Sequence, residues 1–171
     1  MAGGAARLAR ARAYADGAVI PDAQTFDRDV RRAIAAAIRD RGEIPTIAQV
    51  AVSLERDRSE IEAAFQRMIE GHVFIPRDQS TEILAYNPFC AESTDFLVTA
   101  ARRTWWAICA WDALGVPPAL GVTGTIDARC GDCAEPLRIE VGLGGTASAP
   151  EHAVMQVGTP ARDFWKDIYR T

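Results

Sequence analysis

The sequence predicts an α+β fold in which a winged-helix-like three-helix domain with a hairpin precedes a small mixed α/β domain with a mainly antiparallel sheet. Two observations carry this prediction. Apolar residues recur at helical spacing between residues 26 and 70, whereas short strand-like segments separated by turns dominate the rest of the chain. With 171 residues, 49% of them hydrophobic, the chain is long enough to bury a core without disulfides.

Three helices are expected in the first part of the chain. In the first of them Val30, Ile34 and Ile38 recur every four residues and form one apolar stripe. Thr46 is placed to cap the second helix, and Asp57 or Ser59 the third, because short polar side chains accept hydrogen bonds from the first helical amides. The expected helices cover residues 26–41, 46–54 and 59–70.

A hairpin is expected next, with strands at 72–75 and 82–86 joined by a turn at 77–80. Three short helices followed by a hairpin form the winged-helix pattern. Asn87-Pro88-Phe89 then interrupts the pattern and marks a boundary. The expected organisation is an N-terminal arm at 1–24, a winged-helix-like domain at 25–86 and a second domain at 87–171.

The second domain is expected to consist mainly of strands. A helix is predicted from Cys109 to Leu114, ended by Gly115, because Pro117-Pro118 forbids its continuation. The predicted strands lie at 94–99, 103–107, 121–128, 137–143 and 153–157, with a soft loop at 144–150 and a short aromatic helix or turn at 161–169.

Composition limits the classes of function. The formal net charge is −4, which does not suit a dedicated nucleic-acid binder. No apolar run approaches the roughly 20 residues that span a bilayer, and no export signal is evident. A cytoplasmic location is therefore expected, where cysteines are thiols or metal ligands rather than disulfides.

The winged-helix pattern raises DNA binding, but the charges count against it. The third helix would be the reading helix, and it carries Arg58 and Arg67 beside Glu60, Glu62 and Glu70. Carboxylates placed against phosphates repel them. DNA is therefore not an expected partner.

The segment Cys109-Ala-Trp-Asp112 is the first candidate for chemistry. Positions i and i+3 of a helix lie on one face, so the thiol and the carboxylate can point at the same small volume. A thiolate is a soft metal ligand, and a carboxylate beside it can take or give a proton. The alternative is an ordinary buried cysteine with Asp112 at the surface or at a helix cap, and the spacing alone favours it.

The pair Cys130-Gly-Asp-Cys133 is the second candidate, either as a metal half-site or as two unmetallated thiols in a turn. A structural zinc needs four ligands, and the remaining supply is Cys90, Cys109 and two histidines besides carboxylates. Zn(II) at Cys130 and Cys133 would therefore have to be shared between two chains, as in a homodimer.

Histidines and tryptophans give weaker signals. His72 is expected to be structural, whereas His152 could be a ligand or a proton carrier. The tryptophans at 105, 106 and 111 surround Cys109. Core packing is the first interpretation of this stretch, and the wall of an apolar pocket is the second.

The motifs Asn87-Pro-Phe-Cys-Ala91, Trp106-Ala-Ile-Cys-Ala-Trp-Asp-Ala-Leu-Gly115 and Cys130-Gly-Asp-Cys133 with Glu135-Pro136 together resemble the central block of the alkylmercury (organomercurial) lyase-like family. The resemblance covers roughly residues 86–141. The three helices and hairpin ahead of it are similar to the N-terminal part of that family.

The resemblance implies a detoxifying reaction, the protonolysis of a carbon–mercury bond to a hydrocarbon and Hg(II). Two cysteines and one aspartate carry it in the family, and the first cysteine and the aspartate correspond to Cys109 and Asp112. The family requires no bound cofactor, and low-molecular-weight thiols help to remove Hg(II). The expected substrate is a small organometallic compound or another small molecule.

The resemblance also implies a departure. In the family the second catalytic cysteine follows a motif similar to Ala161-Arg-Asp-Phe-Trp-Lys-Asp-Ile168, and this chain ends at Thr171. The C-terminal part of the lyase-like domain is therefore expected to be missing, so that Cys90, Cys130 or Cys133 would have to substitute. Two other functions stay open: a metal- or thiol-sensing winged-helix regulator, and a biosynthetic enzyme that uses the lyase scaffold on another small substrate.

Overall fold

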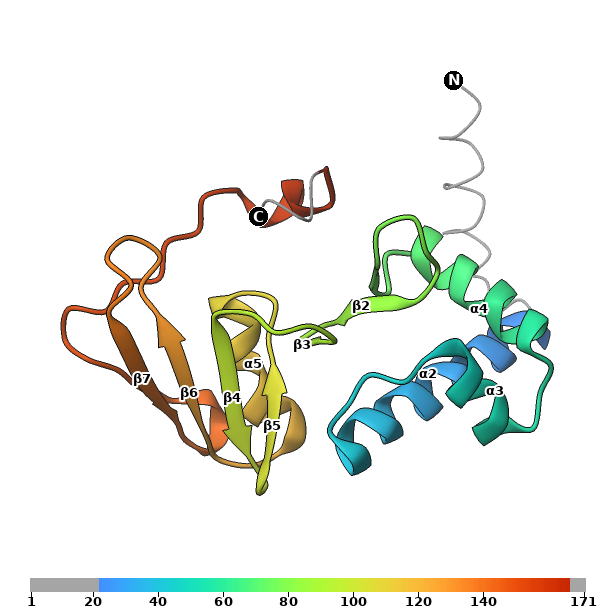
Figure 1. Cartoon of the computed structure of the whole chain (residues 1–171), viewed down its shortest axis with the longest axis horizontal. Coiled ribbons are helices and arrows are strands. Elements are labelled where there is room, and N and C mark those ends of the chain that lie inside the picture. Colours follow the sequence, from blue (N-terminus) through green and yellow to red (C-terminus); the bar gives the residue numbers. More distant parts are fainter. Residues whose placement is uncertain (1–21, 167–171) are drawn as a thin grey trace, which may run out of the picture.

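The computed structural model describes residues 22–166, in which a helical part and a sheet part lie side by side (Figure 1). Most of the arm expected at 1–24 lies outside these residues. Its last three residues are helical, because the first described helix, α2, covers Asp22–Arg41 and so starts before the predicted position 26. No helix among the described residues is long and apolar enough to cross a membrane.

The helical part confirms the three expected helices, with α3 at Ile47–Leu54 and α4 at Arg58–Glu70. Thr46 caps α3 as predicted: its hydroxyl accepts from the Gln49 amide at 3.2 Å, and the Gln49 side chain accepts from the Thr46 amide at 2.7 Å. Asp57, rather than Ser59, is the cap of α4.

The expected hairpin is present, but its first strand is shorter and shifted. Strand β1 is Ile75–Pro76 and pairs antiparallel with β2, Ile83–Tyr86. His72 and Val73 do not join the strand, because their amides donate to the last carbonyls of α4, those of Ile69 and Met68, at 3.0 and 2.9 Å. His72 takes a positive φ of 56° to do so.

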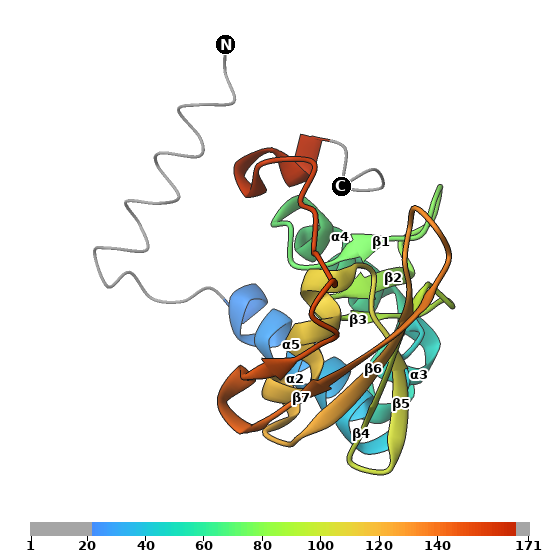
Figure 2. The same ribbon diagram turned by 90° about the vertical axis from the view of Figure 1, so that its left-hand side faces the viewer.

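The sheet confirms the fold class. Its eight strands are all antiparallel, in the order β1-β2-β3-β5-β4-β6-β7-β8. The strands beyond the hairpin are β3 (Phe89–Cys90), β4 (Phe96–Ala100), β5 (Arg103–Trp106), β6 (Gly124–Arg129), β7 (Pro136–Val141) and β8 (Ala147–Ser148). Helix α5 lies against one face of β4 and β6 (Figure 2).

The prediction that Pro117-Pro118 ends the central helix was wrong, because α5 runs from Ala110 to Leu120. Proline removes an amide donor but fixes a φ that a helix accepts. Val116 and Pro117 are buried against the sheet, so packing outweighs the lost hydrogen bonds. The helix ends at Gly121, whose φ of 70° closes it in the left-handed conformation.

The prediction of a strand at 153–157 was also wrong. The edge of β7 pairs instead with β8, inside the loop expected at 144–150. A tight turn brings β8 back at once: a short 3-10 helix, η1, covers Leu143–Gly145, and the Gly142 amide donates to Thr146 at 2.7 Å. Residues 153–157 therefore continue without regular structure to a second 3-10 helix, η2, at Ala161–Lys166. This confirms the expected C-terminal turn over its described part.

One hydrophobic core serves both parts of the fold. Ile34 and Phe65 of the helices belong to the same buried cluster as Val98 and Ile126 of the sheet. Trp105 joins the parts directly, since its indole N–H donates to the Ile38 carbonyl at 3.3 Å. The core therefore fixes the position of the helices relative to the sheet.

Candidate functional site

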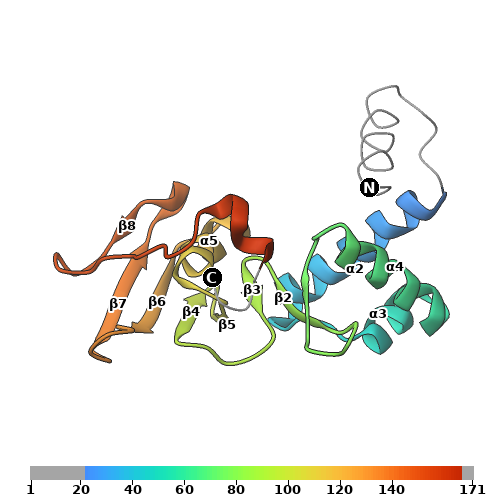
Figure 3. The ribbon, with the colours of Figure 1, turned by 90° about the horizontal axis from the view of Figure 1, so that it is seen from above.

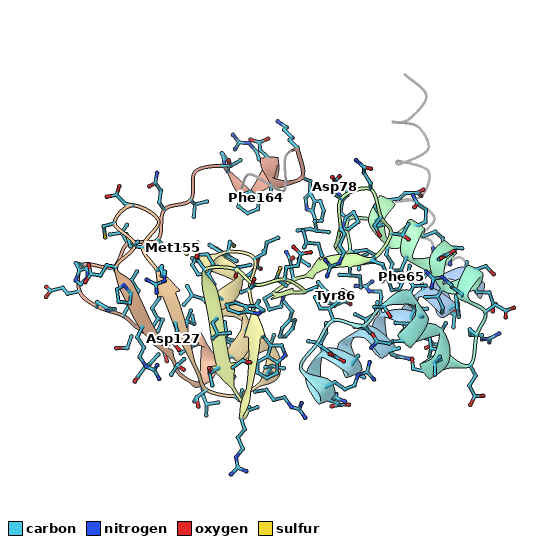
Figure 4. The ribbon with its side chains drawn as sticks, in the orientation of Figure 1. Phe65, Asp78, Tyr86, Asp127, Met155 and Phe164 are labelled. Atoms are coloured by element: carbon cyan, nitrogen blue, oxygen red, sulfur yellow. The ribbon has the colours of Figure 1, made fainter. Side chains whose placement is uncertain are left out.

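A cavity of about 620 Å³ opens at the start of α5. Its wall comes from four parts of the chain: Ile75 of β1, the segment around Asn87-Pro88 with Phe96, residues 108–112 and Gly115 at the start of α5, and the C-terminal segment through residues 155–159 and Phe164. Figure 3 shows this C-terminal segment crossing over α5 toward β2 and β3, and Figure 4 labels Met155 and Phe164 on it.

Cys109 and Asp112 meet at this wall, as the i, i+3 spacing predicts. Cys109 is the N-cap residue of α5, and Asp112 lies in its first turn. The Cys109 thiol donates to the Asp112 carboxylate, with Sγ and Oδ2 3.4 Å apart. Asp112 is 9% exposed, and it is the one charged side chain that is buried among the described residues. The alternative of a surface aspartate is therefore wrong.

Burial sets the protonation of the pair. It raises the pKa of the half-buried Cys109 thiol, while the amides of Asp112 and Trp111 oppose that shift by pointing at the sulfur. Burial likewise raises the pKa of the Asp112 carboxyl, and the hydrogen bond from the Cys109 thiol opposes it. At rest the thiol keeps its proton, but helix amides are already in place to stabilise the sulfur once that proton leaves.

The loop before α5 is held by Thr94, whose role sequence reasoning did not find. The Thr94 hydroxyl donates to the Ala107 carbonyl at 2.6 Å and accepts from the Phe96 amide at 3.1 Å. The Ala107 amide in turn donates to the Phe96 carbonyl at 3.1 Å. This clamp fixes the chain two residues before Cys109.

Cys130 and Cys133 lie elsewhere, in the turn between β6 and β7, as free thiols. Cys130 is half-buried and Cys133 is exposed. The amides of Cys133 and Asp132, and the Cys133 thiol, lower the pKa of Cys130 by hydrogen bonding to its sulfur. Neither cysteine lines the cavity. Within residues 22–166 no three Cys, His, Asp or Glu side chains gather as metal ligands.

The other expected candidates, apart from Trp111, also lie away from the cavity. Cys90 is buried in β3, and burial raises the pKa of its thiol. His72 stacks on Trp165, with ring centroids 4.5 Å apart and planes 6° from parallel. His152 has its Nε2 3.9 Å from a Glu135 carboxylate oxygen. Of the tryptophans, Trp105 is in the core, whereas Trp111 is 66% exposed and lines the cavity.

The C-terminal wall of the cavity contains a second sulfur that sequence reasoning missed. Met155 lines the cavity together with Gln156, Val157 and Phe164. Its thioether is a soft donor like a thiolate. The apolar character of residues 153–157 was the available signal, and it was interpreted as a strand.

Comparisons with known proteins agree with this architecture. A solved structure described as the mercury-bound form of MerB2 is similar, with a TM-score of 0.57 and 20% sequence identity over 72% of this chain and 59% of that chain. At this identity the likeness shows the fold, and the chain spans 59% of that protein's length. No curated protein matches the sequence. The sequence model of the alkylmercury lyase family matches residues 89–170. The resemblance to this family that the sequence shows is thus confirmed for the segment that the family model matches.

Proposed function

We propose that this protein is an organomercurial lyase-like enzyme in which Cys109 binds mercury and Asp112 carries the proton. The observation that carries the proposal is a thiol hydrogen-bonded to a buried carboxylate at 3.4 Å, in the wall of a cavity of about 620 Å³. The match of residues 89–170 to the alkylmercury lyase family supports it. Its substrate is a small organomercurial.

The proton balance follows from the two raised pKa values. When the sulfur of Cys109 bonds to the mercury of an R–Hg–X compound and X⁻ leaves, the thiol proton passes along the existing hydrogen bond to Asp112. Asp112 holds that proton well because it is buried. It then protonates the carbon, the carbon–mercury bond breaks, and R–H leaves while mercury stays on the Cys109 sulfur.

The amides at the start of α5 favour the sulfur-bound state. The N–H groups of Trp111 and Asp112 face Cys109 and stabilise negative charge on its sulfur. The low polarity of the cavity strengthens this effect. No bound cofactor is part of this scheme, and low-molecular-weight thiols are the expected acceptors of Hg(II).

Among the described residues that line the cavity, Cys109 is the one cysteine that could bind mercury. Cys90, Cys130 and Cys133 are all absent from the lining. The expectation that one of them substitutes directly for the family's second catalytic cysteine therefore gains no support from their positions. Cys109 carries the cleavage step with Asp112.

The charges of α4 do not favour the regulator over the enzyme. The two arginines of α4 already pair with carboxylates: Arg58 with Glu62 at 2.9 Å, and Arg67 with Asp27 at 2.5 Å. Neither is a free cation directed at a phosphate backbone.

The test is the release of benzene from phenylmercury acetate, measured in the headspace with excess small thiol present. Asp112→Asn should slow release by about 10²–10⁴-fold, because it removes the proton carrier and leaves the thiol. Cys109→Ser should abolish mercury binding at the site as well. Asp127→Asn is the matched control, since Asp127 is an exposed carboxylate paired with Arg138 at 2.8 Å.

Two results would contradict the proposal. One is full benzene release from Asp112→Asn. The other is a stable phenylmercury adduct on Cys109 of the parent protein without any benzene, which would reduce the site to mercurial binding and direct the search to sensing or to another substrate.

A further inference from the structure

The Cys130–Cys133 turn holds two thiols beside each other, since the Cys133 thiol hydrogen-bonds to the Cys130 sulfur. The backbone closes the turn on itself, since the Cys130 amide donates to the Glu135 carbonyl and the Ala134 amide to the Cys130 carbonyl, both at 2.9 Å. The pair has no third metal-ligating side chain within residues 22–166. Zn(II) prefers four ligands, whereas two thiolates satisfy a soft ion that binds linearly, such as Hg(II).

The turn lies at the same end of the sheet as the cavity. Phe96 at the start of β4 faces Ala128 near the end of β6, and its neighbour Leu97 faces Trp106 at the end of β5. Cys130 directly follows β6, and the loop to Cys109 directly follows β5. Both therefore lie at the same end of the strands. Figure 1 shows the β6–β7 turn and the start of α5 at the same end of their strands.

The C-terminal segment connects the two places. His152 lies beside Glu135, with Nε2 and Oε1 3.9 Å apart, and Glu135 follows Cys133 by two residues. Three residues after His152, Met155 enters the cavity wall that Cys109 shares. A soft thioether thus stands on the segment that runs from the turn to the cavity.

We propose that Cys130 and Cys133 take Hg(II) from Cys109 after carbon–mercury cleavage, with Met155 as the intermediate sulfur. The proposal rests on the proposed lyase function. In the exchange the Cys130 and Cys133 sulfurs each bond to mercury and lose a proton, and the Cys109–mercury bond breaks. Cys109 takes back one proton, and the other leaves with the displaced counter-ion or to solvent. No electrons are transferred, and Cys109 is free for another substrate.

The first experiment uses the full chain with one equivalent of phenylmercury acetate and no added thiol. Free thiols are then alkylated and located by peptide mass spectrometry. Cys109 should be alkylated again, whereas Cys130 and Cys133 should be protected. In the double variant Cys130→Ser with Cys133→Ser, Cys109 should stay protected. Cys90, which is buried in β3 and takes no part in the transfer, is the internal control, because its alkylation should be the same in the parent and in the double variant.

The second experiment uses excess phenylmercury acetate, again without thiol. The parent should release about twice as much benzene as the double variant, because each dithiol pair frees Cys109 once. Met155→Leu keeps the shape of the side chain and removes its sulfur, so it should lower the rate at which Cys130 and Cys133 become protected relative to the rate of the first benzene release. Transfer within one chain should have a rate that does not depend on protein concentration.

Three results would overturn the inference: equal benzene from the parent and the double variant, Cys109 protected while Cys130 and Cys133 remain open to alkylation, or a rate of protection that rises with protein concentration. Protection of the pair by Zn(II) with a doubled particle mass would also overturn it, by identifying a site shared between two copies. If neither the parent nor any variant releases benzene, the lyase proposal fails instead. Loading with HgCl₂ then still tests the transfer by the same alkylation pattern.

Discussion

Asp112 is buried, and none of the ion pairs found among the described residues includes it. A buried carboxylate without a cation costs folding free energy, because the charged form loses its hydration. The hydrogen bond from the Cys109 thiol offsets only part of that cost. A residue that destabilises the fold at the wall of a cavity is the kind of residue that function retains.

The stability of the protein should therefore depend on pH through Asp112. Its raised pKa means that the folded protein holds a proton that the unfolded chain has lost above about pH 4. This contribution to stability is complete below that pH and falls as the pH rises through the folded pKa. Asp112→Asn should be more stable than the parent at pH 7 by about 1 kcal/mol and lack this decline.

Urea unfolding of both proteins across that pH range measures the effect, with Asp127→Asn as the exposed control. Parallel pH profiles of Asp112→Asn and the parent would show that the carboxyl titrates normally in the fold.

At this scale the sequence predicted the site in part. The spacing of Cys109 and Asp112 was sufficient to predict that their side chains meet, although Cys109 is the N-cap residue of α5 with an extended backbone and not part of the helix itself. The contribution of Met155 depends on how a segment of irregular backbone crosses the molecule, and no local pattern encodes that path. The hydrogen bond from Thr94 to Ala107 spans 13 positions, so the role of Thr94 could be found only in the folded chain.

Helix α5 shows that tertiary packing can outweigh the local preference of proline against a helix interior. A rule about proline predicted its end at Gly115, but the helix continues because Pro117 fits closely on β6. A Cβ added at Gly124 would lie 2.8 Å from the Pro117 ring and 2.9 Å from the Thr99 carbonyl. The small residue on the strand is what lets the proline-containing helix approach.

Gly124→Ala should therefore destabilise the fold by about 1–3 kcal/mol, because backbone and ring must both shift. Gly121→Ala is the comparison: nothing lies within 4 Å of its added Cβ, so only the strain of its φ of 70° remains, at about 1 kcal/mol. Thermal unfolding of both variants checks the order. A smaller loss from Gly124→Ala than from Gly121→Ala would contradict close packing of α5 on β6.

The C-terminal segment links distant parts of the whole molecule across the cavity. It leaves the sheet after β8, lines the cavity through residues 155–159, and meets the helical part where Trp165 of η2 stacks on His72. Such an aromatic contact contributes about 0.5–1.5 kcal/mol. This contact of modest strength therefore helps to hold the segment over the cavity.

Trp165→Ala should let the cavity open more often, and the alkylation of Cys109 by a bulky maleimide should become several-fold faster. Val154→Ala is the control, since Val154 belongs to the same segment, is 87% exposed and does not line the cavity. Equal labelling rates in Trp165→Ala and the parent would mean that the stacked rings do not limit access.

The shared core has a consequence for how this protein can be divided. The family match begins at Phe89, yet β3 pairs with β2 of the preceding hairpin through Ala85 and Cys90, and Trp105 bonds to Ile38. Recombination of genes at that point would divide the sheet between β2 and β3 and would expose buried apolar surface on both fragments. Swapping the helical part between relatives should therefore succeed only when the residues that contact Trp105 are exchanged with it. We therefore expect the two parts to be inherited together.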